Sequence, residues 1–173
     1  MILNLEIQQP AKLAAIDTDG NSLTYGELVE FSNQVMPVIP SRSLVFMMTE
    51  NNVGGIAWIM SFLELKQVPL ILNAHTEEEL YTNLYDIYKP AYLCVPTNSP
   101  RKENHKVVME AYGYSLLATG NEPHSLHDDL SHLLPTSGST GSPKLVRHKY
   151  ENIDAAALNI STFFELTAED RPL

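Results

Sequence analysis

The sequence predicts an α/β domain with a largely parallel sheet that helices cover on both faces. Short apolar segments typical of buried strands, such as residues 43–49 and 68–72, alternate with longer segments that have helical spacing. Glycine, proline and asparagine separate these segments. Because parallel strands need crossover connections that pack on the sheet, this alternation favours one sheet between two helical layers.

The chain opens with a predicted hairpin and a capped helix. Residues 12–17 alternate weakly between apolar and polar, and the turn-rich residues 17–21 join them to residues 22–23. Thr24 and Glu27 have the spacing of a capping box. We expect a scaffolding role for this part, with no catalysis. The apolar face of the helix is traced by Tyr25, Leu28, Val29, Ser32, Val35 and Met36.

The next segments predict a buried strand, a buried helix and another strand. Residues 43–49 fit the first strand, and Asn51 or Asn52 can cap the helix that follows. That helix has little polar face, so we expect it to be largely buried. Trp58 within it is expected to pack in the core, the alternative being an apolar pocket. Residues 68–72 then fit the second strand.

A second pair with capping-box spacing, Thr76 and Glu79, predicts a helix that ends at Tyr88. Residues 91–95 predict a strand that contains the only cysteine, Cys94. A single cysteine excludes an internal disulfide, and its apolar neighbours predict a buried thiol rather than a catalytic one.

Residues 103–112 predict a short helix that Gly113 ends, and residues 114–118 predict a strand. We expect one soft joint, at residues 120–131, within a domain that covers residues 1–173. Histidine and aspartate residues gather at this joint in a pattern that can bind zinc or nickel, although the spacing matches no closed structural site. The alternative is a solvated loop, and we assign no metal ligand. These residues are His124, His127, His132, Asp128 and Asp129.

The composition argues against nucleic-acid binding, because 21 acidic residues against 11 basic ones give a formal charge of −10. A length of 173 residues with 44% hydrophobic residues is enough for a core. No apolar run is long enough to span a bilayer, and the first ten residues carry Glu6 instead of the basic start of a secretory signal. We therefore expect a cytoplasmic protein.

The chemistry of the chain concentrates in one loop of glycine and hydroxyl residues that ends in a lysine. Such a run cannot bury an apolar face, so it is expected to face solvent between apolar segments. Its glycines let consecutive backbone N–H groups turn toward an anion, its hydroxyls add donors, and the lysine adds positive charge. We predict a phosphate site formed by Thr136, Ser137, Gly138, Ser139, Thr140, Gly141 and Lys144.

The alternative interpretation of this loop is a flexible connector. The proline and lysine fixed to its end, and the strand-like segments on both sides, favour a site. A Walker A loop is excluded, because the fifth position after Gly138 is Pro143 and not glycine. The nearby Arg147 and Lys149 either add to the positive charge or lie on a solvated strand edge, and His148 either faces the ligand or lies on the strand surface.

The segment TSGSTGSPK, residues 136–144, resembles the signature loop of the adenylate-forming superfamily. This superfamily includes acyl-CoA synthetases, the adenylation domains of peptide synthetases and luciferases. Nine consecutive positions fit the family pattern, and the next position, usually glycine, is Leu145. Residues 23–28, 65–70 and 166–171 are similar to other family motifs and follow the family order. The resemblance covers nearly the whole sequence and corresponds to the N-terminal part of the family's large domain.

The resemblance implies an ATP-dependent carboxylate ligase that uses Mg²⁺. Such an enzyme forms an acyl adenylate, releases pyrophosphate and normally passes the acyl group to a thiol of coenzyme A or of a carrier protein. The loop residues would hold the outer phosphates. The family's acyl pocket, its adenine and ribose contacts and its catalytic lysine follow this loop, so the resemblance assigns no catalytic residue within this chain and implies that the chain alone is inactive.

Two other functional classes stay open. One is a stand-alone, non-catalytic module that binds a nucleotide or another anion, or that complements a second chain. The other is a plain α/β interaction domain in which the loop is only a connector. If the sheet belongs to a larger domain, its uncovered apolar surface would favour self-association.

Overall fold

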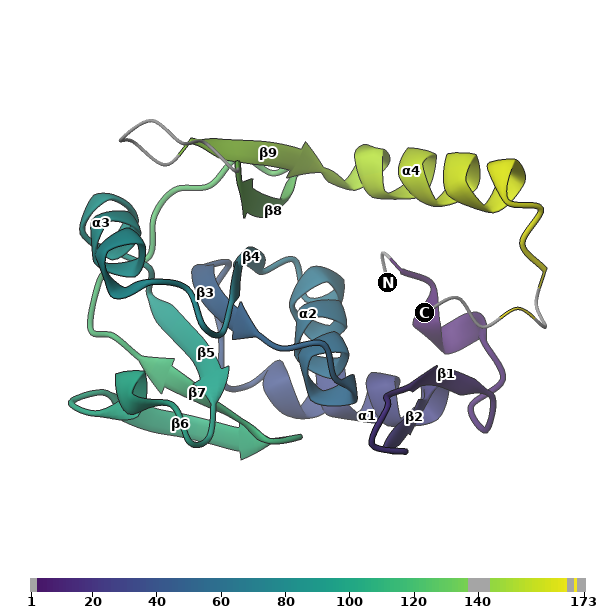
Figure 1. Ribbon diagram of the computed structural model, residues 1–173, viewed down its shortest axis with the longest axis horizontal. Helices are drawn as coiled ribbons and strands as arrows, with labels where there is room; N and C mark the ends of the chain where they lie inside the picture. The colour runs from purple at the N-terminus through teal and green to yellow at the C-terminus, as the bar shows by residue number, and fades with distance from the viewer. Residues whose placement is uncertain (1–2, 137–143, 168–169, 171–173) are drawn as a thin grey trace.

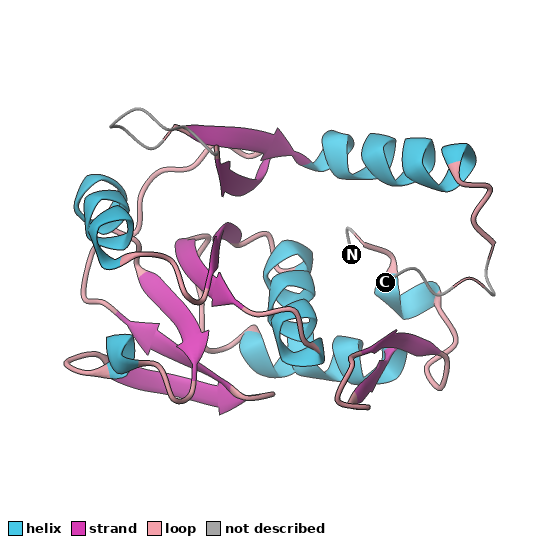
Figure 2. Cartoon of the chain, viewed as in Figure 1, coloured by secondary structure: helices cyan, strands magenta, loops and turns pink. Residues whose placement is uncertain are grey.

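The computed structural model describes residues 3–136, 144–167 and 170. In this part of the chain, a seven-stranded sheet has the order β6-β7-β5-β3-β4-β8-β9 (Figure 1). Its helices are α1 (Tyr25–Val35) and α2 (Val53–Glu64) on one face and α3 (Glu78–Tyr88) on the other. A two-stranded hairpin of β1 (Leu13–Ile16) and β2 (Ser22–Thr24) lies beside α1 (Figure 2). The predicted α/β class, with helices on both faces, is confirmed.

The centre of the sheet is parallel and its edges are antiparallel. The parallel strands are β5 (Tyr92–Pro96), β3 (Leu44–Thr49), β4 (Val68–Asn73) and β8 (Leu130–Pro135). The antiparallel additions are β6 (Lys106–Ala111), β7 (Tyr114–Ala118) and β9 (Leu145–Lys149). Strand β3 lies in the middle and pairs with β4 over its full length, from Leu44 opposite Val68 to Thr49 opposite Asn73.

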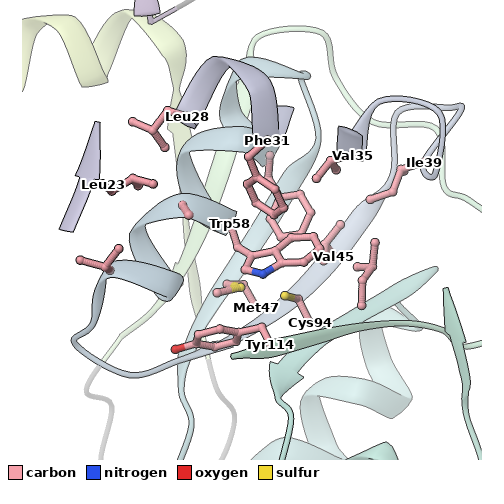
Figure 3. Packing of buried hydrophobic residues seen from close by; sticks show 14 of the residues in the cluster. Leu23, Leu28, Phe31, Val35, Ile39, Val45, Met47, Trp58, Cys94 and Tyr114 are labelled. Atoms are coloured by element: carbon pink, nitrogen blue, oxygen red, sulfur yellow. The ribbon is translucent and has the colours of Figure 1, made fainter. Parts of the chain in front are cut away.

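The face covered by α1 and α2 holds a large aromatic core. Trp58 is fully buried, and the Phe31 ring meets it edge-on with the ring centroids 4.9 Å apart (Figure 3). The Trp58 indole N–H donates to the Ala111 carbonyl at 3.0 Å. Cys94 lies in the same core, where burial raises the pKa of its thiol well above the usual value and keeps it protonated. The predictions of a core tryptophan and a buried cysteine are confirmed.

Two of the three predicted helix caps form. Thr24 donates its backbone N–H to Glu27 Oε2 at 2.7 Å, and the Glu27 N–H donates to Thr24 Oγ1 at 3.2 Å, which completes the capping box of α1. Asn52 caps α2 by accepting the Gly55 N–H at 2.8 Å.

The capping box predicted for α3 is wrong. The Thr76 hydroxyl donates to the Asn73 carbonyl at 2.7 Å instead, and α3 begins two residues later, after Glu77, with no side-chain cap. The Thr76 N–H also donates to the Asn73 carbonyl, at 2.9 Å, so Thr76 belongs to the turn after β4 and Glu77 takes the N-cap position.

The helix predicted over residues 103–112 is also wrong. A 3-10 turn, η2 (Pro100–Lys102), precedes this segment, and the segment itself forms β6, which pairs with β7. Tyr112 and Gly113 both have positive φ, 50° and 77°, as the two central residues of a tight hairpin turn do. Gly113 therefore turns the chain between two strands instead of ending a helix.

Helix α4 (Tyr150–Phe163) follows β9 and none of its residues is buried. Figure 1 shows it extending away from β9, separated from the other helices. Large apolar side chains on and just after it are exposed, with Phe163 at 79%, Leu158 at 67% and Phe164 at 65% of their area accessible. The exposed apolar surface is thus on a helix, whereas the sequence led us to expect one on the sheet. Among the described residues, no helix has the length and apolar character needed to cross a membrane.

Candidate functional site

The two ends of the predicted phosphate loop lie opposite each other at the tip of a hairpin. Strand β8 enters the loop and β9 leaves it, with Pro135 opposite Leu145 as the last pair of the ladder. The Thr136 N–H donates to the Lys144 carbonyl at 2.9 Å, one step beyond that pair. This bond closes the loop at its base and fixes the backbone of its first and last residues.

Thr136 and Lys144 are both exposed. The other predicted site residues, Ser137, Gly138, Ser139, Thr140 and Gly141, lie outside the described residues. Strand β8 runs parallel to β4, so Thr136 follows the carboxyl end of a parallel strand. Ligands of open α/β sheets bind at that end. Among the described residues, no carboxylate lies within ion-pair distance of Lys144.

The cations that follow Lys144 on β9 differ in their surroundings. Lys149 Nζ lies 3.7 Å from Asp129 Oδ2 and 3.6 Å from Glu151 Oε1. These carboxylates partly neutralise the charge of Lys149 near the start of α4. Arg147 borders a mostly apolar cavity of about 530 Å³ between the hairpin and the C-terminal end of α3. The strand-edge interpretation fits Lys149, whereas Arg147 lies beside a cavity.

Sequence reasoning missed a cross-strand pair of histidines in this hairpin. The register places His132 of β8 opposite His148 of β9, and their rings stack with centroids 4.5 Å apart and an interplanar angle of 2°. The Ser131 hydroxyl donates to the His148 carbonyl at 2.9 Å and lies 3.0 Å from His132 Nδ1, so it accepts from that nitrogen in the neutral ring. Only the strand register, which the sequence did not give, brings these two rings together.

His132 stays neutral in this stack. Burial, and then the proximity of His148, lower the pKa of His132 from 6.5 to about 4. The His132 ring is therefore uncharged at physiological pH.

The histidines of the predicted soft joint have separate contacts. His124 Nε2 donates to the Tyr88 carbonyl at 2.8 Å, at the end of α3, and His127 Nδ1 accepts the Asp129 N–H at 3.2 Å. Within the described residues, no three His, Cys, Asp or Glu side chains are grouped so that they could hold a metal ion. The soft joint itself stays a prediction.

Relatives found by sequence are synthases much longer than this chain. Tyrocidine synthase 3 from Brevibacillus parabrevis is 31% identical over 144 residues, which are 78% of this chain and 2% of that protein. Bacitracin synthase 3 from Bacillus licheniformis is 27% identical over 146 residues, which are 80% of this chain and 2% of that protein. The chain thus spans only a small share of the length of these relatives. No protein-family model matches the sequence.

Solved structures extend the likeness to almost the whole chain. Apo MatB from Rhodopseudomonas palustris has a TM-score of 0.74 at 18% identity, over 98% of this chain and 38% of its own length. O-succinylbenzoate coenzyme A synthetase (MenE) from Bacillus subtilis, in complex with AMP, has a TM-score of 0.72 at 21% identity, over 98% of this chain and 47% of its own. The chain has the N-terminal portion of the adenylate-forming fold.

A third structure with the adenylate-forming fold is a fatty acyl-adenylate ligase from L. pneumophila, in complex with acyl adenylate and pyrophosphate. It matches 97% of this chain and 33% of its own, with a TM-score of 0.74 and 16% identity. At these identities the likeness establishes the fold alone. The resemblance noted in the sequence is confirmed at that level.

Acid is expected to destabilise the hairpin through His132. Its pKa is about 4 in the folded protein and near 6.5 in an unfolded chain, so between these values only the unfolded chain takes up the proton. Stability is therefore unaffected above pH 6.5 and falls as the pH drops from 6.5 toward 4. Urea unfolding of the parent chain and of His132→Phe over this range measures the effect, and the variant is expected to lose less stability because its ring does not titrate.

His75→Gln is the matched control, since the His75 side chain is 83% exposed. Its stability should follow that of the parent chain at every pH. If the curves of His132→Phe and the parent run parallel between pH 6.5 and 4, the burial of a neutral His132 is wrong.

Proposed function

We propose that this chain is the N-terminal part of an ATP-dependent carboxylate ligase, in which the loop of residues 136–144 holds the outer phosphates of ATP. The observation that carries the proposal is the closure of this loop by Thr136 and Lys144 at the carboxyl end of β8, within the adenylate-forming fold. The reaction would form an acyl adenylate and pyrophosphate, and commonly a thioester afterwards.

The chemistry of the loop suits the leaving group of this reaction. A substrate carboxylate attacks the α-phosphorus, the bond to the bridging oxygen breaks, and negative charge builds on the departing diphosphate. Backbone N–H groups, hydroxyls and the ammonium of Lys144 stabilise charge that develops there and hold the diphosphate in line. Lys144 suits this task because it is exposed and has no carboxylate partner among the described residues.

Solved relatives support the use of ATP. MatB has been solved with ATP bound, and the L. pneumophila ligase with acyl adenylate and pyrophosphate. Mg²⁺ enters the proposal as a companion of the nucleotide and supplies positive charge to its phosphates when bound. Mg²⁺ prefers carboxylate and phosphate oxygens, and Thr136 and Lys144 offer no carboxylate, so its ligands here would be mainly those of the nucleotide.

The proposal makes residues 1–173 one portion of an adenylation domain that acts on a carboxylate and a thiol acceptor in the cytoplasm. The chain spans 38% of MatB and 47% of MenE in the matched structures, and the apolar side chains of α4 lack cover among the described residues. The same two observations favour the second candidate function, a non-catalytic module that complements another chain.

Replacing Lys144 with alanine is expected to weaken ATP binding by about ten- to a hundredfold, because a hydrogen bond to a charged group contributes roughly 1.5–3 kcal/mol. Isothermal titration of ATP with Mg²⁺ measures the change. Lys149→Ala is the matched control, since Lys149 is at the far end of the strand that follows Lys144 and is paired with Asp129 and Glu151. It should bind ATP like the parent chain. Equal binding by Lys144→Ala and the parent would favour the connector interpretation of the loop.

Residues 1–173 alone are expected to be inactive in adenylation, because the proposal assigns them phosphate binding and no catalytic residue. The measurement is the carboxylate-dependent exchange of labelled pyrophosphate into ATP by the isolated chain. No exchange above the protein-free rate is expected with any of a panel of carboxylates. Exchange that Lys144→Ala abolishes would show that the chain is catalytic and would overturn the assignment.

The isolated chain is also expected to self-associate through the exposed apolar side chains of α4. Light scattering after size exclusion should give a mass that rises with concentration, and Phe163→Glu should lower it toward that of the monomer, because a carboxylate cannot be buried there without cost. Ile87→Glu on α3, where Ile87 is 63% exposed, is the control. A monodisperse monomer at all concentrations would contradict the uncovered-surface argument.

A further inference from the structure

Arg42 gathers three distant parts of the chain around one guanidinium group. It precedes β3, and its Nη1 donates to the Lys66 carbonyl in the turn between α2 and β4. Its Nη2 donates to the His127 carbonyl at 3.0 Å and to the Leu130 carbonyl at 2.5 Å. One side chain thereby joins the start of β8 to the segments that directly precede β3 and β4.

The tie supports a strand that packs along β4 but forms a short ladder with it. The β4–β8 ladder contains one pair of residues, Leu70 opposite Leu133, whereas β3 and β4 pair over six residues. Leu133 is buried in the core cluster on the α3 side, which anchors the middle of β8. Its first residue, Leu130, is held by Arg42.

The second strand of the hairpin, β9, ends at the same place. Tyr150, which follows β9, donates its backbone N–H to the Asp129 carbonyl at 3.3 Å and its hydroxyl to the Leu63 carbonyl at 3.5 Å. Burial raises the pKa of this hydroxyl, and the nearby Arg42 opposes that shift. The base of the β8–β9 hairpin, which consists of residues 127–130 and Tyr150, is therefore held beside the Arg42 guanidinium.

A shift at the base of this hairpin reaches its tip. The stacked rings of His132 and His148 and the bond from Thr136 to Lys144 make the two strands one unit, six residues long from Leu130 to Pro135 on β8. We propose that Arg42 is a positioning residue for the nucleotide, because it sets the place of this hairpin on the parallel sheet and so the place of Thr136 and Lys144. The proposal rests on the proposed phosphate role of the loop.

The geometry calls for arginine at this position. A guanidinium presents five N–H donors in a fixed plane and can serve several carbonyls at once, whereas the ammonium of lysine is a compact charge on a flexible stem. Arg42→Lys keeps the positive charge and most of the packing of the side chain, but it loses the planar set of N–H donors that reaches several carbonyls at once. Arg42→Gln removes the charge as well.

Two measurements on Arg42→Lys, Arg42→Gln and the parent full chain test the proposal. Hydrogen exchange reports the opening of the hairpin at its own amides, including the Thr136 N–H, and titration with ATP and Mg²⁺ reports nucleotide affinity. Exchange in β8 and β9 is expected to rise about tenfold or more in Arg42→Gln, with a smaller rise in Arg42→Lys. ATP affinity is expected to fall in the same order, since binding weakens as the competent fraction shrinks.

Arg101→Gln is the matched control. Arg101 is also half-buried and donates to two backbone carbonyls, those of Ala74 and Thr76, and to the Glu78 carboxylate, but none of these three partners belongs to the β8–β9 hairpin. Its variant should lose stability without faster exchange in β8 and β9. Thermal unfolding of every variant separates a local change from general loss of structure, and Arg42→Lys serves if Arg42→Gln does not fold.

The outcomes separate this inference from the proposed function. Unchanged exchange in β8 and β9 in both Arg42 variants would overturn the tie, whatever happens to ATP. Faster exchange with unchanged ATP affinity would overturn the positioning role. A parent chain that binds no ATP would instead overturn the phosphate role of the loop, and the exchange data would still decide whether Arg42 holds the hairpin.

Discussion

The burial of β3 on both of its faces is the constraint on which the rest of the structure depends. Its side chains alternate between the two layers: Val45 and Met47 join the core under α1 and α2, and Phe46 and Met48 join the core under α3. All four are essentially inaccessible to solvent. A strand with no polar face must have a helical layer on each side and a neighbour on each edge, which β4 and β5 supply in parallel.

The hairpin that carries the candidate site is attached at the margin of this core. Leu133 reaches into the α3 layer, while His132 on the opposite face stacks against His148 and stays neutral. The result is a two-stranded hairpin, with a register shift between Leu130 and His132, that leaves Thr136 and Lys144 exposed where its ladder ends. A phosphate grip needs such a support, because charge stabilisation depends on donors that do not reorganise during the reaction.

The sequence predicted well where one local interaction decides the structure. Thr24 and Glu27 satisfy each other within one turn, and no neighbouring segment competes for either side chain. Thr76 had the same spacing to Glu79, but its backbone N–H and its hydroxyl both donate to the Asn73 carbonyl, which places it in the turn after β4. Spacing alone does not reveal such a competitor, because it depends on where the strand before the helix ends.

Longer-range pairing explains the remaining errors. Residues 103–112 had a plausible helical pattern, yet β6 forms because β7 offers it a full ladder and Trp58 donates to the carbonyl of Ala111. Glycine is common both at the end of a helix and in a tight hairpin turn, so Gly113 did not distinguish the two structures. Tyr112 and Gly113 both have positive φ, as the hairpin turn requires. The stacked histidines and the Arg42 contacts, which join residues 85 and 88 positions apart, depend on register and could not be predicted from a local pattern.

The one departure from the family loop has a structural reading in this hairpin. Leu145 stands where a glycine is usual, and here it starts β9 directly after Lys144, opposite Pro135. Its side chain is half-buried and packs against the α3-side core, which glycine could not do. Leucine therefore fixes the strand that begins directly after Lys144, and the Lys144 carbonyl accepts the Thr136 N–H as the next step of the same ladder. The substitution exchanges the backbone freedom that glycine would have after the lysine for a side chain that anchors the start of β9 in the core.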